Sequence, residues 1–186
     1  HKTKRIPPDA ENALEALRAK GIKIFMATGR HFTELLQLPV NHIKFDGYVT
    51  LNGRLCLDTN GEILRGTPFD KELSEKLIAI FERKRYPLVL VEAQRIYINF
   101  VNDEVCKALE NVSTSAPEVG LYRGDELYQA SMFLKEEEEI FLGDALPEHC
   151  KFVRWNEDGV DIISANGGKS EGIRYFCECF GIRQSE

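Results

Sequence analysis

The chain has 186 residues, of which 43% are hydrophobic and 29% are charged, the balance of an ordinary soluble globular protein. Its net charge of −6 argues against a nucleic-acid partner, because surfaces that neutralise phosphates are usually basic. No apolar run approaches the roughly 20 residues of a membrane-spanning helix and no signal peptide is visible, so we expect no membrane partner.

Cysteine and histidine occur in a pattern that predicts neither a metal centre nor a disulfide framework. The number of cysteines is odd, no C-x-x-C pair occurs, and the histidines have no metal-type spacing. Free thiols and a reducing, cytoplasmic setting are therefore expected. His31 lies close to a candidate site described below, but a solvated position on a helix explains it equally well. The residues concerned are Cys56, Cys106, Cys150, Cys177, Cys179, His1, His31, His42 and His149.

The first third of the chain has the element order of a parallel α/β sheet. Pro7-Pro8, followed by an apolar stripe that ends at Gly21, predicts a helix. Residues 22–27 form a mostly apolar run, which predicts a strand buried on both faces. A short helix through Leu36 follows, and residues 47–51 predict the next strand. Strand, helix and strand in this order form a βαβ unit.

The middle of the chain predicts a hairpin and then a separate α+β unit. Alternating apolar residues on both sides of Asn60-Gly61 indicate a β-hairpin over residues 54–65. Gly66-Thr-Pro68 predicts a hinge. The elements expected beyond it are a helix around residues 73–81, strands at 87–91 and 96–100, a helix from 102, a strand at 128–134, an acidic helix at 136–142, and strands at 151–155 and 160–164.

A last helix, which follows Gly168-Lys169 and ends at Gly181, returns the chain to the first unit. The middle unit is therefore an insertion. We predict an α/β fold in which residues 1–68 and 164–186 form the two parts of a core and residues 69–163 form an inserted α+β domain.

Phosphate-binding chemistry is suggested where the first predicted strand ends. Thr28 follows that strand directly, and ligands in open α/β sheets bind beyond the carboxyl ends of strands. Its hydroxyl and the backbone N–H groups after it, unhindered at Gly29, are suited to a phosphate oxygen. Arg30 adds a fixed cation with a planar donor fork. A plain strand-to-helix turn is the alternative.

Two further segments are candidates for the same site. Lys169 opens a helix, where a cation is disfavoured by the dipole, so it calls for an anionic partner such as phosphate; the alternative is an exposed lysine. Asn52-Gly53 ends the second strand at the same sheet edge as Thr28. It either lines the pocket or only turns the chain into the hairpin.

These short motifs occur in a fixed order along the chain. Residues 22–30 come first, residues 45–53 second, then the long insertion, then Gly168-Lys169 at a helix start. The Arg5-Ile-Pro7 lead-in and Arg154-Trp155 near the close of the insertion belong to the same pattern. In this order and spacing the chain resembles the Cof-type branch of the haloacid dehalogenase superfamily, nearly from end to end.

The resemblance implies an aspartate-nucleophile phosphohydrolase with a Rossmann-like core, here partial, and an inserted cap domain of C2 type. Thr28 would bind the transferring phosphoryl group. Lys169 would stabilise the nucleophile and the charge that develops in transfer. Arg30 and Asn52 would touch the substrate between core and cap. The cap would close over the leaving group and exclude water.

Two family motifs do not occur in the chain. There is no D-x-D, which would carry the nucleophile and the acid/base, and no G-D-x-x-x-D, which would help to bind Mg²⁺. Phosphoryl transfer by this route needs both sets of carboxylates. We therefore expect the magnesium ligands and the nucleophile to lie in segments absent from this chain, and the 186 residues to be inactive alone.

The sequence therefore predicts a Mg²⁺-dependent phosphatase that acts on a small phosphorylated metabolite, such as a sugar phosphate, as a monomer or weak homo-oligomer. The alternative is a non-catalytic binding or regulatory module on the same fold. A Rossmann-type nucleotide-binding domain is disfavoured, because no G-x-G-x-x-G follows the first strand. Polar residues of the insertion that could contact the leaving group, although each is more often a solvated or ion-paired residue, are Arg95, Asn99, Arg123 and Arg154.

Overall fold

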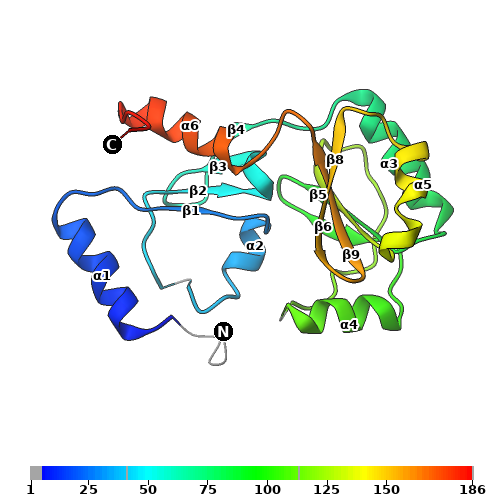
Figure 1. Ribbon diagram of the computed structural model, residues 1–186, viewed down its shortest axis with the longest axis horizontal. Coiled ribbons are helices and arrows are strands. Elements are labelled where there is room, and N and C mark those ends of the chain that lie inside the picture. The colour runs from blue at the N-terminus through cyan, green and yellow to red at the C-terminus, as the bar shows by residue number, and fades with distance from the viewer. Residues whose placement is uncertain (1–5, 41, 113, 186) are drawn as a thin grey trace. The chain divides into compact units, whose positions relative to one another are not determined.

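The computed structural model describes residues 6–40, 42–112 and 114–185, so His1 and Arg5 of the patterns above lie outside the described part. The chain divides into two compact units (Figure 1). One comprises His1–Gly66 and Gly168–Glu186, and the other comprises Thr67–Gly167. The role of the second unit as a cap stays a prediction. None of the described helices is both long and apolar enough to cross a membrane.

The first unit is built on a four-stranded sheet in the order β1-β2-β3-β4. Strands β1 and β2 are parallel, and β3 and β4 follow as an antiparallel hairpin, which confirms the predicted βαβ unit and hairpin. Its elements are α1 (Pro8–Ala19), β1 (Phe25–Ala27), α2 (Phe32–Leu35), β2 (Gly47–Thr50), the 3-10 turn η1 (Leu51–Gly53), β3 (Leu55–Leu57), β4 (Ile63–Gly66) and α6 (Lys169–Phe180).

The first strand differs from its prediction. It covers only Phe25–Ala27, Phe25 and Met26 are half-buried, and Ala27 is exposed. The expectation of a strand buried on both faces is therefore wrong. The reason is position: β1 is the first strand of the sheet and pairs with β2 alone among the described strands. The apolar run begins at Ile22, which lies in the turn after α1 and is 47% exposed.

Helix α6 runs along one face of this sheet (Figure 1). Phe176 packs against Val49 and Cys56, and a Cβ at Gly172 would lie 2.4 Å from Val49, so only glycine allows this approach. The predicted apolar face of α6 is covered only in part, because Ile173 and Phe180 are 46% and 43% exposed.

The second unit is a five-stranded antiparallel sheet in the order β6-β5-β7-β9-β8. Residues from α3, α5 and four of the strands share one buried apolar cluster, which forms the core of the unit. The observed elements confirm those expected from the sequence, except that the acidic helix expected at 136–142 is a 3-10 turn followed by a separate short helix. They are α3 (Lys71–Arg83), β5 (Leu88–Glu92), β6 (Ile96–Ile98), α4 (Asp103–Asn111), β7 (Leu127–Phe133), η2 (Glu136–Glu138), α5 (Ile140–Ala145), β8 (Cys150–Asn156) and β9 (Gly159–Ser164).

Candidate phosphate-binding site

The loop after β1 is held by its own hydrogen bonds. The Thr28 N–H donates to the Val49 carbonyl at 2.8 Å, which extends the parallel pairing of β1 and β2 by one residue. The Thr28 Oγ1 accepts the Arg30 N–H at 3.1 Å. The Arg30 N–H, one of the backbone groups predicted to bind phosphate, is therefore bonded to the Thr28 side chain. Because Oγ1 accepts on that side, the hydroxyl proton is free to point elsewhere.

The turn after β2 has an unusual backbone. Leu51, Asn52 and Gly53 have φ values of 48°, 53° and 92°, so three successive residues lie in the left-handed region. Left-handed backbone costs a non-glycine residue about 1–2 kcal/mol. Leu51 is also fully buried, so surrounding structure has to hold it there. Such strain is characteristic of ligand-binding loops.

Two backbone hydrogen bonds join this turn to the first loop. The Asn52 N–H donates to the Thr28 carbonyl at 3.1 Å, and the Leu51 N–H donates to the Arg30 carbonyl at 3.2 Å. A Cβ at Gly29 would lie 3.0 Å from the Asn52 side-chain amide, so the two segments are in direct contact.

The same turn contacts the start of α6. A Cβ at Gly53 would lie 2.1 Å from the Gly168 carbonyl oxygen and 3.2 Å from the Lys169 nitrogen. The loop that begins at Thr28 and the helix start at Lys169 therefore both contact this turn, although the two residues are 141 positions apart in the sequence. The structure brings all six predicted site residues into one contiguous region of the first unit, in which Asn52 is buried; their roles in binding stay predictions.

This region combines donors and cations suited to an anion. Helix α6 has twelve residues and Gly168 as its N-cap, with no side chain capping its first N–H groups, and Lys169 is exposed. Arg30 is less available than the sequence suggested. Its Nη1 lies 3.5 Å from Glu34 Oε1, and the two side chains are 28% and 21% exposed.

Sequence reasoning missed the buried polar residues beneath the loops. His31 is only 2% exposed and caps α2: its Nδ1 accepts the Thr33 N–H, and Glu34 accepts the His31 N–H. The solvated reading of His31 is therefore wrong, and the His-x-x-Glu spacing of a capping box was the available signal. Thr50 is fully buried, and its Oγ1 has no hydrogen-bond partner among the described residues. Arg54 is also buried, at 5% exposure.

The four residues of the inserted unit predicted as leaving-group contacts differ in burial and in their partners. Asn99 is fully buried and makes four hydrogen bonds, so it is a structural residue, neither a ligand group nor a surface one. Arg95 and Arg154 are ion-paired, with Glu92 and Glu139 respectively. Arg123 is exposed.

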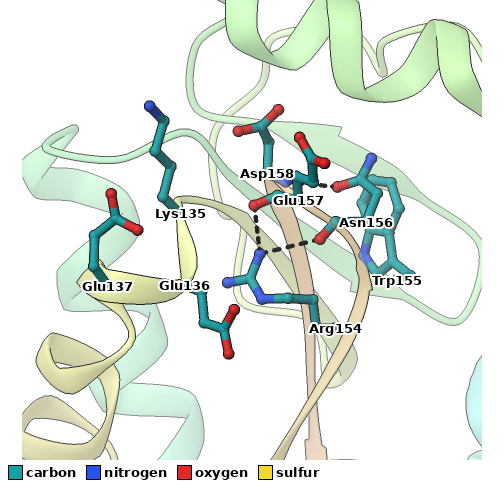
Figure 2. A pocket seen from close by; sticks show the side chains of 8 residues that line it. All are labelled: Lys135, Glu136, Glu137, Arg154, Trp155, Asn156, Glu157 and Asp158. Atoms are coloured by element: carbon teal, nitrogen blue, oxygen red, sulfur yellow. Dashed lines mark hydrogen bonds between the residues drawn. The ribbon is translucent and has the colours of Figure 1, made fainter.

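A surface pocket of about 710 Å³ lies at the β8–β9 turn of the inserted unit (Figure 2). The Arg154 guanidinium, which lines this pocket, donates to the carbonyl oxygens of Asn156 and Glu157 at 3.1 and 2.8 Å. Lys135 and Glu137 extend away from that group in the figure. Since its main cation is committed to the fold, the pocket offers no converging set of ligand groups. The residues that line it are Lys135, Glu136, Glu137, Arg154, Trp155, Asn156, Glu157 and Asp158.

Potential metal ligands do not cluster in the described part of the chain. Within residues 6–40, 42–112 and 114–185, no group of three or more His, Cys, Asp or Glu side chains is arranged to hold a metal ion.

Known proteins share both the sequence pattern and the fold. A protein of Bacillus subtilis (strain 168) named "Putative phosphatase YkrA" is 25% identical over 179 residues, which cover 94% of this chain and 68% of that protein. The solved structure of the HAD subclass IIB sugar phosphatase BT4131 is 30% identical with a TM-score of 0.79, over 96% of this chain and 70% of that one. A structure from work on a trigonal-bipyramidal intermediate in a phosphoryl-transfer superfamily has the same identity and coverages and a TM-score of 0.81.

The family assignment rests on the whole chain. Residues 1–186 match the sequence model of the family described as haloacid dehalogenase-like hydrolase. The motif order, the sheet topology and the solved relatives agree with that match. The chain therefore belongs to the haloacid dehalogenase-like hydrolase family.

Proposed function

We propose that this chain supplies the phosphate-binding part of a magnesium-dependent phosphatase that acts on small, sugar-phosphate-like metabolites. Family membership supports a hydrolase, and the relatives named as phosphatases support the reaction class. The observation that carries the proposal is the Leu51–Gly53 turn, because it contacts both the Thr28 loop and the start of α6.

Three of the predicted residues, Thr28, Lys169 and Asn52, have a defined task in this proposal. The Thr28 hydroxyl, which accepts the Arg30 N–H, donates its proton to a phosphoryl oxygen. The uncapped N–H groups of α6 and the Lys169 ammonium offset the negative charge of the phosphoryl group, which is the main demand of phosphoryl transfer. Asn52 holds the Thr28 loop in place through its backbone N–H.

The nucleophile and the metal are assigned outside the 186 residues. The described residues hold no metal-binding cluster, and the sequence has no D-x-D pair. In the proposal an aspartate of the complete protein accepts the phosphoryl group and water then releases it; magnesium, when bound, offsets phosphate charge. The 186-residue chain alone should bind inorganic phosphate without turnover. The complete protein is proposed to be cytoplasmic, a monomer or weak homo-oligomer, and without a nucleic-acid or membrane partner.

Hydrolysis of p-nitrophenyl phosphate by the complete gene product tests the proposal. Turnover should require Mg²⁺ and stop with EDTA. Thr28→Val removes the hydroxyl at nearly constant volume and should lower kcat about 100- to 1000-fold, as loss of one charge-stabilising donor does. Thr28→Ser keeps the hydroxyl and should retain most activity. Thr59→Val, at an exposed position, is the matched control.

Two outcomes would contradict the proposal: absence of magnesium-dependent turnover, or full activity of Thr28→Val. A non-catalytic binding module on the same fold is the second candidate. It predicts phosphate binding that Thr28→Val abolishes in a complete protein that never turns over.

A further inference from the structure

An ion pair between a buried carboxylate and a partly exposed arginine closes the β5–β6 turn of the inserted unit. Arg95 Nε and Nη2 each donate to one oxygen of Glu92 at 2.8 Å, a bidentate arrangement. The Tyr97 hydroxyl donates to Glu92 Oε1 at 2.7 Å. The Glu92 side chain is only 4% exposed, so this carboxylate is satisfied by its protein partners.

The guanidinium of Arg95 is fixed in orientation as well as in position. Its central carbon lies 4.3 Å from the centroid of the Tyr97 ring, which holds the plane from one face. Nη2 also approaches the Leu121 carbonyl, at 3.5 Å. A guanidinium held in this way loses little further side-chain freedom when it binds a ligand.

Arg95 keeps unused donors. Its side chain is 29% exposed, and no described group accepts a hydrogen bond from Nη1. Arg154 of the same unit makes a useful contrast. Its Nε is also bonded to a carboxylate, that of Glu139, but its Nη1 donates to three backbone carbonyls.

A second cation, Arg123, follows a segment that contacts the neighbouring strand β6. The segment before Arg123 runs along β6: the Ile98 N–H donates to the Glu118 carbonyl, and the Gly120 N–H donates to the Ile98 carbonyl, at 3.0 and 2.9 Å. Burial alone would raise the pKa of Glu92, but hydrogen bonds from Arg95 and Tyr97 and the charges of Arg95 and Arg123 lower it.

Arg123 is not neutralised by a neighbour of its own. No carboxylate of the described chain lies within ion-pair distance of it, and the nearby Glu126 accepts a hydrogen bond from Tyr128 instead. The Glu92 carboxylate is therefore bonded to one arginine and lies within the electrostatic reach of a second, which has no ion-pair partner among the described residues.

We propose that Arg95 and Arg123 form an oxyanion-binding site in the inserted unit, which takes a phosphate or carboxylate group of a small ligand. The Nη1 edge of Arg95 supplies directed donors, and Arg123 supplies the second charge. A buried ion pair is weak support for stability by itself, because desolvation opposes the attraction between the charges. A rigid, partly exposed guanidinium with an unused donor edge is, however, well suited to ligand recognition.

Side-chain NMR of the 186-residue chain tests this site directly. The Nε–H of Arg95 is bonded to a carboxylate and should give a resolved signal, as should the Nε–H of Arg154. Titration with inorganic phosphate, and separately with acetate, should shift the Arg95 signal and leave that of Arg154 unchanged. The two titrations decide whether the site prefers phosphate or carboxylate.

Variants separate a binding site from a structural turn. Arg95→Lys keeps the charge but loses the fork, and Arg123→Gln loses the second charge. Each should weaken phosphate binding to this unit about tenfold. Arg154→Lys is the matched control. Trp155 fluorescence reports folding of the unit, and Arg123→Gln serves where Arg95→Lys disturbs it, because the Arg123 side chain makes no hydrogen bond within the described part of the chain.

The same titration of the Thr28→Val variant keeps this test independent of the proposed function. The variant lacks the phosphate site proposed at Thr28, and its Arg95 signal should still shift when phosphate is added. The proposal is overturned if neither anion shifts the Arg95 signal, if Arg154 shifts equally, or if Arg123→Gln binds as the parent does.

Discussion

Gly53→Ala probes the packing that joins the candidate site together. Gly53 has a φ of 92°, so alanine pays about 1–2 kcal/mol for left-handed backbone. The new Cβ would also lie 2.1 Å from the Gly168 carbonyl oxygen, a contact that requires backbone movement. Overpacking of this kind adds about 1–3 kcal/mol. We expect a total loss of about 2–5 kcal/mol in the unfolding free energy of the first unit.

Gly21→Ala is the matched control, because Gly21 has a φ of 78° and nothing lies within 4 Å of its Cβ position. It should lose only the backbone part. Urea unfolding followed by circular dichroism should show a midpoint for Gly53→Ala lower by about 1 M than for Gly21→Ala. The single tryptophan, Trp155, lies in the other unit, so its fluorescence transition should stay unchanged. Equal midpoints for the two variants would refute the packing argument.

Three further predictions concern single side chains. Asp70 accepts the Leu73 N–H as the N-cap of α3, and this bond lowers its pKa below the ordinary 3.8. Its stabilising charge is therefore present above about pH 4 and lost as pH falls through the lowered value. Asp70→Ala should cost about 1 kcal/mol at pH 7, measured by Trp155 fluorescence in urea, whereas Asp70→Asn should keep the cap and lose the pH dependence; equal pH profiles would contradict this. Asn99→Ala leaves several buried backbone groups without hydrogen-bond partners and should lower the unfolding free energy by at least about 3 kcal/mol in the same measurement. A loss below about 1 kcal/mol would show that water replaces the amide. Burial raises the pKa of Cys56 to about 11, so at pH 8 only about a thousandth is thiolate, and a disulfide reagent should label exposed Cys106 far faster; equal rates would disprove the burial.

Features set by local chemistry were predictable from the sequence. Asn102 accepts the Val105 N–H and starts α4, and Gly181, with a φ of 64°, ends α6. The Asn-Gly turn joins β3 to β4. The closeness of Thr28 and Asn52 was predictable for a related reason: they follow neighbouring parallel strands, whose carboxyl ends meet at one sheet edge.

Features set by distant partners were not predictable. Asn99 has the composition of a surface residue, yet it bonds to Phe81, Tyr86 and Leu88, which belong to other parts of the unit. Sequence alone does not show that these backbone groups lack other partners. The exposure of Ile173 was missed in the same way, because helical spacing predicts an apolar face but not how much of it is covered.

The left-handed turn also restricts how this protein can change. Leu51, Asn52 and Gly53 occupy adjacent left-handed positions, so none can relax without moving the next. Substitutions there should be strongly non-additive, and a change tolerated in one background should be harmful in another. Descendants of this sequence would then replace residues of the turn as sets, with epistasis confining their variation to the few combinations that keep both neighbouring segments in contact.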